Sequence, residues 1–295
     1  MAVSGSSSSS KFTRRQFVRT ALVGATSLAI YAGEIERHFL EVNRSEVRIP
    51  GLHAAFDGTR IAQLSDIHLD AFTEPFFLRH AVNRINQLNP DMVFLTGDYV
   101  TSGRLYRRFD HDAAGQCGAI LSQLVCPRRY AILGNHDVSA GAAMVTAALV
   151  EHGIPVLRNS YIPIEQGGGR FWLSGLDDAV EGKPDPERAI PFSIRNIVQE
   201  PVILMCHAPD YVDRLLADPV GRAISLVLSG HTHGGQVRLP LVGPLTLPKL
   251  GKKYVEGWFR LQNLQLHVNR GLGTVGVPFR FDCPPEISVI TLRAV

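Results

Sequence analysis

Cysteine and excess charge are both scarce in this chain of 295 residues. Its four cysteines, none with Cys-x-x-Cys spacing, exclude a zinc knuckle, a thioredoxin-type site and a disulfide scaffold. They leave room for a disulfide in an oxidising compartment. Residues 33–295 carry 26 Lys and Arg against 27 Asp and Glu, so no basic stripe is available to neutralise nucleic-acid phosphates. We therefore expect no nucleic-acid partner, and we interpret the small cluster Arg104, Arg107 and Arg108 as a solvated loop.

A long hydrophobic run is also missing. The apolar stretch from Ala21 to Ala32 is short, because a membrane-spanning helix needs about 20 residues. It follows a Ser-rich start and the pair Arg14-Arg15, with Phe17 two residues on. A basic segment followed by a short apolar one is typical of export signals, and this pattern resembles the twin-arginine signal of bacteria and archaea. An ordinary secretory signal that contains Arg-Arg is the alternative.

These features predict the organisation and the location of the chain. We expect residues 1–32 to be an export signal or an N-terminal anchor, residues 33–45 a polar connector, and residues 46–295 a single domain. The twin-arginine machinery exports folded proteins, which suits an enzyme that loads metals before it leaves the cytoplasm. The expected location is the periplasm, the cell envelope or the extracellular space, with a membrane surface as a candidate partner. Small residues at Ser27-Leu28-Ala29 fit cleavage only weakly, so cleavage and retention both stay open.

The body alternates two kinds of segment, which predicts α/β layering. Short apolar runs indicate strands at 60–65, 92–96, 130–133, 171–174, 202–206 and 224–229. Apolar residues at helical spacing indicate helices at 74–88, 110–124, 139–152 and 209–217. Four later segments indicate strands with little helix between them, at 236–239, 254–259, 264–270 and 286–293. We expect these later strands to form a second sheet, giving a β-sandwich flanked by helices.

Five short polar motifs each follow the end of a predicted strand. They are Ser65-Asp66-Ile67-His68, Thr96-Gly97-Asp98, Gly134-Asn135-His136-Asp137, His207, and Gly230-His231-Thr232-His233-Gly234-Gly235-Gln236. Ligands of open α/β sheets bind at the carboxyl ends of the strands, so these motifs are expected to converge on one site.

The residue types in these motifs are typical of a transition-metal site. Imidazole nitrogens favour zinc and iron, whereas carboxylate and amide oxygens also accept manganese. Asp66 and His68 are two residues apart, as are His231 and His233, so each pair points to one face of an extended backbone. Any one motif alone is weak, since a strand-end Asp is usually a helix cap, but their order and number favour a shared metal centre.

The same motifs resemble the calcineurin-like metallophosphoesterase superfamily over roughly residues 46–295. The stretch Ala62–His68, the extended Gly230–Gln236 motif, and the later Asn269–Gly273 and Pro284–Ile287 are similar to its YkuE/YaeI-type phosphodiesterase subgroup. The resemblance implies a four-layer αββα sandwich of two mixed sheets flanked by helices. It also implies hydrolysis of a phosphodiester or pyrophosphate bond by a hydroxide that two metal ions activate.

The resemblance further assigns ligands to two divalent or trivalent ions of manganese, iron or zinc. One ion would be held by Asp66, His68, Asp98 and His233, and the other by Asp98, Asn135, His207 and His231. His136 would stabilise the transition state or protonate the leaving oxygen. Asp137 would either orient His136 or cap the following helix, and both readings stay open.

The substrate is less determined than the reaction. Residues 237–250 form an apolar, Pro-rich stretch, which fits either a partly buried connector or an apolar rim that meets an acyl chain or a membrane. A lipid-linked phosphoester would suit an exported enzyme. Some relatives of the subgroup hydrolyse UDP-diacylglucosamine, a nucleotide substrate that fits poorly with export. The alternatives are a metallo-β-lactamase, whose compact His-x-His-x-Asp-His cluster is absent, and a non-catalytic metal-binding envelope module.

Overall fold

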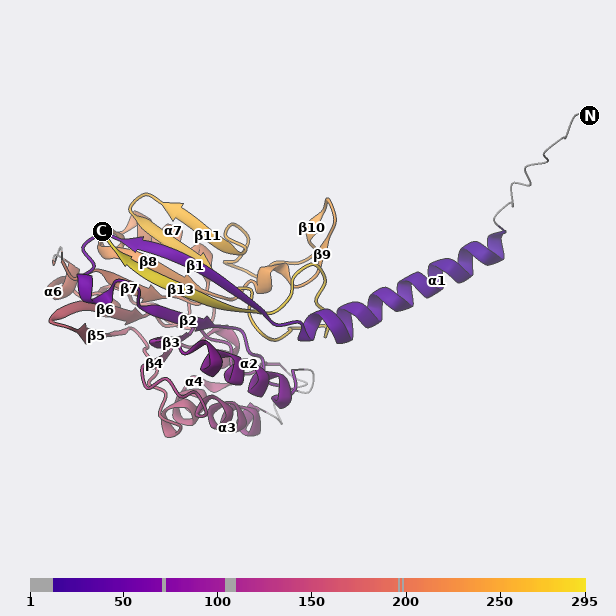
Figure 1. Cartoon of the computed structure of the whole chain (residues 1–295), viewed down its shortest axis with the longest axis horizontal. Helices are drawn as coiled ribbons and strands as arrows, with labels where there is room; N and C mark the ends of the chain where they lie inside the picture. The colour runs from indigo at the N-terminus through magenta and orange to yellow at the C-terminus, as the bar shows by residue number, and fades with distance from the viewer. Residues whose placement is uncertain (1–12, 71–72, 104–109, 196, 198) are drawn as a thin grey trace, which may run out of the picture.

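Two β-sheets packed face to face form the centre of the protein (Figure 1). The computed structural model describes residues 13–295 apart from 71–72, 104–109, 196 and 198. The Ser-rich start and the cluster Arg104, Arg107 and Arg108 lie outside the described residues.

The first sheet has the strand order β1-β13-β2-β3-β4. Its strands are β1 (Glu41–Ile49), β13 (Glu286–Ala294), β2 (Arg60–Leu64), β3 (Met92–Leu95) and β4 (Arg129–Ala131). β2, β3 and β4 run parallel, whereas β13 is antiparallel to β2 and parallel to β1.

The second sheet has the order β11-β12-β8-β7-β6-β5. Its strands are β11 (Gly257–Leu261), β12 (Leu264–Val268), β8 (Ile224–Ser229), β7 (Val202–Met205), β6 (Gly169–Gly175) and β5 (Ser160–Gln166). The four central strands are parallel and both edge strands are antiparallel, so this sheet is mixed like the first.

Helices cover the outer face of each sheet, which completes four layers. α2 (Pro75–Leu88), α3 (Asp110–Leu121) and α4 (Asn135–Glu151) pack on the first sheet around residues such as Leu64 and Leu95. α5 (Pro186–Ala189), α6 (Phe192–Arg195) and α7 (Val212–Ala217) pack on the second. A third apolar cluster fills the space between the sheets. The predicted αββα sandwich of two mixed sheets flanked by helices is therefore confirmed.

Two of the later strands lie elsewhere than in the expected second sheet. β13 lies between β1 and β2 in the first sheet, where Ile287 and Val289 face the helices and Ile290 and Leu292 face the other sheet. Strands that are covered on both faces carry apolar residues on both faces, as β13 does. The segment at 236–239 gives only β9 (Arg238–Leu239), which pairs with β10 (Gly243–Pro244) in a separate hairpin. Strand β5 was not predicted, because most of its side chains are partly or fully exposed.

The expected polar connector at 33–45 carries structure of its own. β1 begins at Glu41, so its first five residues belong to the sheet although the domain was expected to begin at 46. Glu36 is buried and accepts a hydrogen bond from the backbone N–H of Cys283 (2.7 Å). The backbone N–H of Arg280 donates to the carbonyl of Ala32 (3.0 Å), which ties this segment to the body.

The N-terminal helix α1 (Arg14–Ile30) extends away from the sandwich (Figure 1). Thr13 and Gln16 form a capping box at its first turn, which satisfies N–H groups that would otherwise lack partners. A π-helical turn, η1 (Tyr31–Ile35), and a 3₁₀ turn, η2 (Glu36–His38), connect α1 to β1. Among the residues described, no helix combines the length and apolar character needed to cross a membrane.

Candidate metal centre

The seven predicted ligands follow the carboxyl ends of five strands. Asp66 and His68 follow β2, Asp98 follows β3, and Asn135 opens α4 after β4. His207 follows β7, and His231 and His233 follow β8, so both sheets contribute. Two sets of predicted ligands have ligand atoms within 4.8 Å of one another, namely Asp66, His68 and His233, and Asp98, His207 and His231. His136 forms a third such group with His68 and Asp98. The expected convergence of strand ends therefore occurs.

The carboxylate of Asp98 lies between the two sets. Its Oδ2 is 3.5 Å from Nε2 of His68 and 3.2 Å from Nε2 of His207. Oδ1 of Asp66 is 3.5 Å from Nε2 of His233. At these distances one cation could lie between the two atoms of each pair. Asp98 is close enough to both ligand sets to bind a cation in either.

Five of the predicted ligands have left-handed backbone. The φ angles of Asp66, His68, Asp98, His231 and His233 are 49°, 48°, 58°, 75° and 51°. Non-glycine residues rarely adopt this conformation, which costs about 1–3 kcal/mol each and is concentrated at functional sites. The surrounding structure therefore holds these side chains in position against a local backbone preference.

In three of the predicted ligands, one atom that could coordinate a metal makes no hydrogen bond to a described residue. Nδ1 of His207 donates to the carbonyl of Thr96 (2.7 Å), and its buried Nε2 has no partner. Nε2 of His231 bonds the carbonyl of Lys249 (2.8 Å), which leaves Nδ1 available. The buried Oδ1 of Asn135 also lacks a partner. Unpaired buried polar atoms are costly, and a cation would satisfy those of His207 and Asn135 and could also bind Nδ1 of His231.

His68 is oriented in the same way by residues that the sequence motifs did not include. The hydroxyl of Thr101 donates to Asp70 (2.6 Å) and lies 3.3 Å from Nδ1 of His68. Because the hydroxyl proton is directed at Asp70, the oxygen is left to accept from Nδ1–H. The lone pair of Nε2 then points to the centre, 3.1 Å from Nε2 of His233. Two imidazole nitrogens this close are stabilised by a shared cation, so the residues present fit a metal pair.

The charges of the cluster suit cation binding. Burial lowers the pKa of His68 to about 3 and that of His231 to about 4, and it lowers the pKa of His233 as well. Imidazole coordinates metals in its neutral form, so these rings need to lose no proton. Against the effect of burial, Asp98 raises the pKa of His207 well above its usual range, and His207 in turn holds the pKa of Asp98 well below its own. Asp98 is therefore a carboxylate at neutral pH. A cation between them would take the place of the proton on His207.

Asp137 caps α4 and also fixes the loop that carries Asp98. Its carboxylate accepts hydrogen bonds from the backbone N–H groups of Gly134 (2.9 Å), Asp98 (2.7 Å) and Tyr99 (2.8 Å). No hydrogen bond joins it to the His136 ring among the described contacts. The structure thus favours the capping interpretation. With this cap, α4 begins at Asn135, four residues before the expected start at 139, and the predicted ligand Asn135 lies in its first turn.

Two glycines make room for the carboxylates. A Cβ on Gly134 would lie 2.2 Å from Oδ1 of Asp98, and one on Gly230 would lie 2.2 Å from Oδ2 of Asp66. Any larger residue would displace a ligand, which explains glycine at both positions.

The ring of His136 is held by Ser102, a residue that belongs to none of the five sequence motifs. The backbone N–H of Ser102 donates to Nδ1 of His136 (3.1 Å), and the Ser102 hydroxyl is 3.0 Å from the same atom. Nδ1 is thus an acceptor, and the proton of the neutral ring is on Nε2. Ser102 lies four residues after Asp98 on the same strand-end loop, and that position was the signal available in the sequence.

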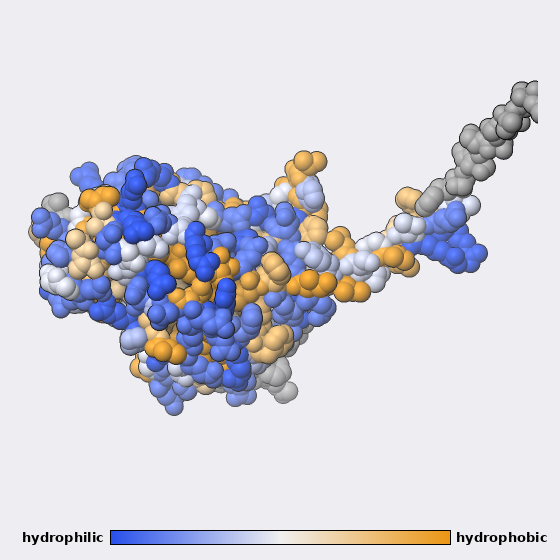
Figure 2. Space-filling model, viewed as in Figure 1, coloured by the Kyte–Doolittle hydropathy of each residue, from blue (hydrophilic) through white to orange (hydrophobic). Residues whose placement is uncertain are grey.

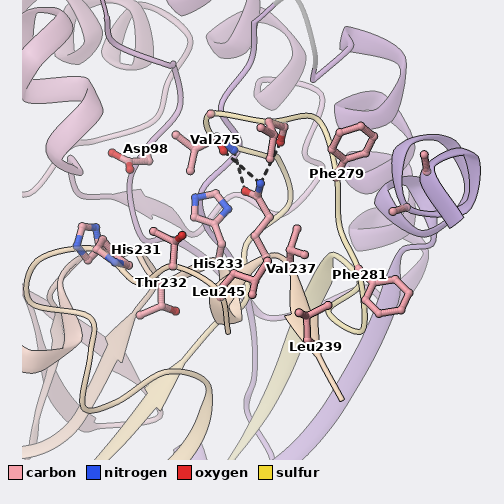
Figure 3. Close-up of a pocket in the computed structure, with 18 of the residues that line it drawn as sticks. Asp98, His231, Thr232, His233, Val237, Leu239, Leu245, Val275, Phe279 and Phe281 are labelled. Carbon is pink, nitrogen blue, oxygen red and sulfur yellow. Dashed lines mark hydrogen bonds between the residues drawn. The ribbon is translucent and has the colours of Figure 1, made fainter. Parts of the chain in front are cut away.

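A cavity of about 750 Å³ opens from this cluster toward the surface (Figure 3). Its polar end is lined by Asp98, Asn135, His136, His231 and His233. The other walls are apolar and come from three separate segments. They are residues 25–32 of α1 and η1, residues 237–248 around the β9–β10 hairpin, and residues 275–281. In Figure 3, Phe279 and Phe281 lie at the end of the cavity remote from Asp98 and His231, beside α1.

A model of the calcineurin-like phosphoesterase family matches residues 59–235, which include all seven predicted ligands. The chain belongs to this family. It is therefore a metallophosphoesterase, and the predicted resemblance is confirmed.

Curated relatives match over nearly the whole chain. The metallophosphoesterase YkuE of Bacillus subtilis is 33% identical over 96% of this chain and 99% of its own length. The phosphodiesterase YaeI of Escherichia coli is 30% identical over 95% and 99%. LpxG of Chlamydia muridarum, a UDP-2,3-diacylglucosamine pyrophosphatase, is 26% identical over 92% and 95%. Among solved structures, a dimetal phosphatase from Danio rerio has a TM-score of 0.50 at 13% identity, covering 80% of this chain and 99% of that one. That structure supports the fold alone.

Proposed function

We propose that this metallophosphoesterase hydrolyses a phosphodiester or pyrophosphate bond of a lipid-linked substrate in the cell envelope. The observation that carries the proposal is the cavity, which joins the two ligand sets at one end to long apolar walls at the other. We assign one ion to Asp66, His68, Asp98 and His233, and a second to Asp98, Asn135, His207 and His231. Manganese, iron and zinc all suit this mixture of oxygen and nitrogen ligands.

When bound, such ions would activate water and neutralise charge at phosphorus. The protein's own residues would hold the ions and position His136. Asp98 reaches both ligand sets, and its Oδ1 accepts a hydrogen bond from the backbone N–H of His136 (2.8 Å). This contact fixes the start of α4, and with it His136, relative to the bridging carboxylate.

The environment of His136 favours one of its two expected roles. An imidazolium would carry a proton on Nδ1, directly facing the N–H of Ser102. The neutral ring with hydrogen on Nε2 avoids this conflict, and it can donate a hydrogen bond from Nε2 to a phosphoryl oxygen. We therefore assign transition-state stabilisation rather than proton donation to His136.

The apolar walls support a substrate with an acyl or alkyl chain. Val237, Leu239 and Leu245 line the cavity, which favours the apolar rim over the connector for residues 237–250. The pyrophosphatase relative has a substrate with two acyl chains, as its name states. For this chain, the expected export argues against a nucleotide and for an envelope lipid. Export by the twin-arginine route is inferred from Arg14, Arg15 and the apolar part of α1.

A chain-length series tests the proposal. The full-length protein would be assayed with manganese on p-nitrophenyl phosphodiesters whose second alcohol runs from methanol to dodecanol. Each buried methylene should raise kcat/KM by up to about fourfold until the cavity is filled. The monoester p-nitrophenyl phosphate should be the poorer substrate. A flat series with chelator-sensitive turnover would keep the reaction and reject the lipid class, whereas no turnover of any compound would reject the reaction.

A further inference from the structure

Exposed apolar side chains surround the mouth of the cavity. The hairpin between β9 and β10 carries Leu241 and Val242 at its tip, with exposed fractions of 109% and 70%. Leu241 has a φ of 68°, in the left-handed region that hairpin tips usually reserve for Gly or Asn. A strained, fully exposed leucine at this position is unfavourable in water, which indicates a partner for the tip.

A second apolar surface begins inside the cavity and continues outward along α1. Ala25, Ala29 and Ala32 line the cavity at helical spacing, and Val18 and Leu22 extend the same stripe toward the N-terminus. Both of the outer residues are exposed, at 62% and 66%. Figure 2 shows the hairpin and the inner part of α1 as adjacent hydrophobic regions on one side of the body.

The charge of α1 identifies the kind of partner. Arg14, Arg15 and Arg19 lie in its first two turns, and the chain has no acidic residue before Glu34. In Figure 2 the outer end of the helix is hydrophilic, where these arginines lie. A helix with an apolar stripe and a basic end is typical of binding at the interface of anionic membranes.

We propose that the cavity mouth docks on an anionic phospholipid bilayer, with α1 lying along the headgroup boundary and Leu241 and Val242 inserted beside it. Because α1 forms one wall of the cavity, this proposal requires that the N-terminal segment is not cleaved from the active enzyme. This docking deepens the proposed function, because a lipid substrate would pass from the bilayer into the apolar walls without crossing water.

Vesicle sedimentation of the full-length protein tests the docking without relying on turnover. Vesicles of equal parts phosphatidylcholine and phosphatidylglycerol are compared with vesicles of phosphatidylcholine alone. The protein should partition preferentially onto the anionic vesicles, and each of the changes Arg14→Gln, Arg15→Gln and Arg19→Gln should reduce that partition by about fivefold. The double change Leu241→Asp with Val242→Asp should reduce it at least about tenfold.

The matched control is Val125→Asp combined with Phe192→Asp, which introduces the same charges at exposed apolar sites away from the cavity. It should bind vesicles and hydrolyse bis-p-nitrophenyl phosphate as the unmodified chain does. Equal binding by the hairpin variant and this control would overturn the proposal, as would an unmodified protein that stays in the supernatant. Self-association that the hairpin changes abolish without lipid would make a second copy the partner instead. Missing hydrolysis alongside normal sedimentation would overturn the proposed function and leave the docking standing.

Discussion

The two ends of the cavity are built in opposite ways. At the inner end Asp66, His68 and Asp98 are at most 1% exposed, and hydrogen bonds fix their side chains or backbones from several strands. At the mouth, Leu241 and Phe279 are exposed and are placed by a short hairpin and a loop.

This difference separates the residues that determine the reaction from those that determine the substrate. The inner end depends on long-range hydrogen bonds that tolerate little displacement, as metal coordination and phosphoryl chemistry require. The mouth requires only apolar surface of suitable extent, so many sequences can supply it. We therefore expect changes at the inner end to affect turnover of every phosphoester, and changes at the mouth to affect only the preference among them.

Outside the assigned metal ligands, the largest expected effect is that of His136→Gln. Loss of a preorganised hydrogen-bond donor at the phosphoryl group should reduce kcat by about 10²–10³-fold. Metal content, measured by elemental analysis, should not change, because His136 is not among the assigned ligands. The matched variant His80→Gln, at an exposed position of α2, should keep full activity. A His136→Gln protein as active as that control would remove this residue from the reaction.

Asp137→Asn tests how strongly the inner end is fixed. The amide group would face backbone N–H donors that the carboxylate now satisfies, so the free energy of unfolding should fall by about 2–4 kcal/mol. Urea unfolding at constant m-value would measure the change. Asp213→Asn breaks an exposed ion pair with Lys253 and should cost less than about 1 kcal/mol. Equal midpoints for the two variants would show that the loop does not depend on Asp137.

Acid should weaken a buried contact between β2 of the first sheet and β12 of the second. Nδ1 of His267 lies 2.8 Å from the Oε1 of Gln63, and burial lowers the pKa of His267 to about 4. Above about pH 6.5 the ring is neutral in both the folded and the unfolded chain. Below that pH only the unfolded chain takes up the proton, so stability falls by roughly 1.4 kcal/mol per pH unit until about pH 4. His267→Gln should lessen the slope of unfolding free energy against pH, and His80→Gln should leave it unchanged.

The smallest expected effect is at the mouth. Phe279→Ala should lower kcat/KM for the dodecyl phosphodiester about fivefold relative to the methyl one, the equivalent of roughly 1 kcal/mol of lost apolar burial. Phe192→Ala, at an exposed position of α6, provides the comparison. An unchanged ratio of kcat/KM between the two substrates would show that Phe279 does not bind the alkyl chain. It would also contradict the expectation that residues at the mouth determine substrate preference.

The same difference governs what the sequence could predict. Asp66, His68, Asp98, His207 and the other ligands were predictable because each directly follows an apolar strand run, and strand ends converge in this fold. The four-layer architecture followed from the alternation of strands and helices together with the family resemblance.

Other features depend on contacts that sequence spacing does not encode. Ser102 reaches His136 across 34 positions, and Thr101 reaches His68 across 33. β1 is rich in polar residues because it lies at a sheet edge, and the apolar faces of β13 fit either sheet, since both sheets are covered on both faces. Nothing in the pattern of α1 indicated that its inner end would form a wall of the cavity.

The central claim is that hydrolysis depends on two metal ions, both of which Asp98 would help to hold. The most direct test is Asp98→Asn in the full-length protein, with bound metal and hydrolysis of bis-p-nitrophenyl phosphate measured on the same samples and Asp213→Asn as the control. The account predicts that bound metal falls from about two ions per chain and that turnover falls at least about a thousandfold, as it should for the unmodified protein treated with chelator. Unchanged turnover in the Asp98→Asn protein, or full activity after complete removal of metal, would contradict it.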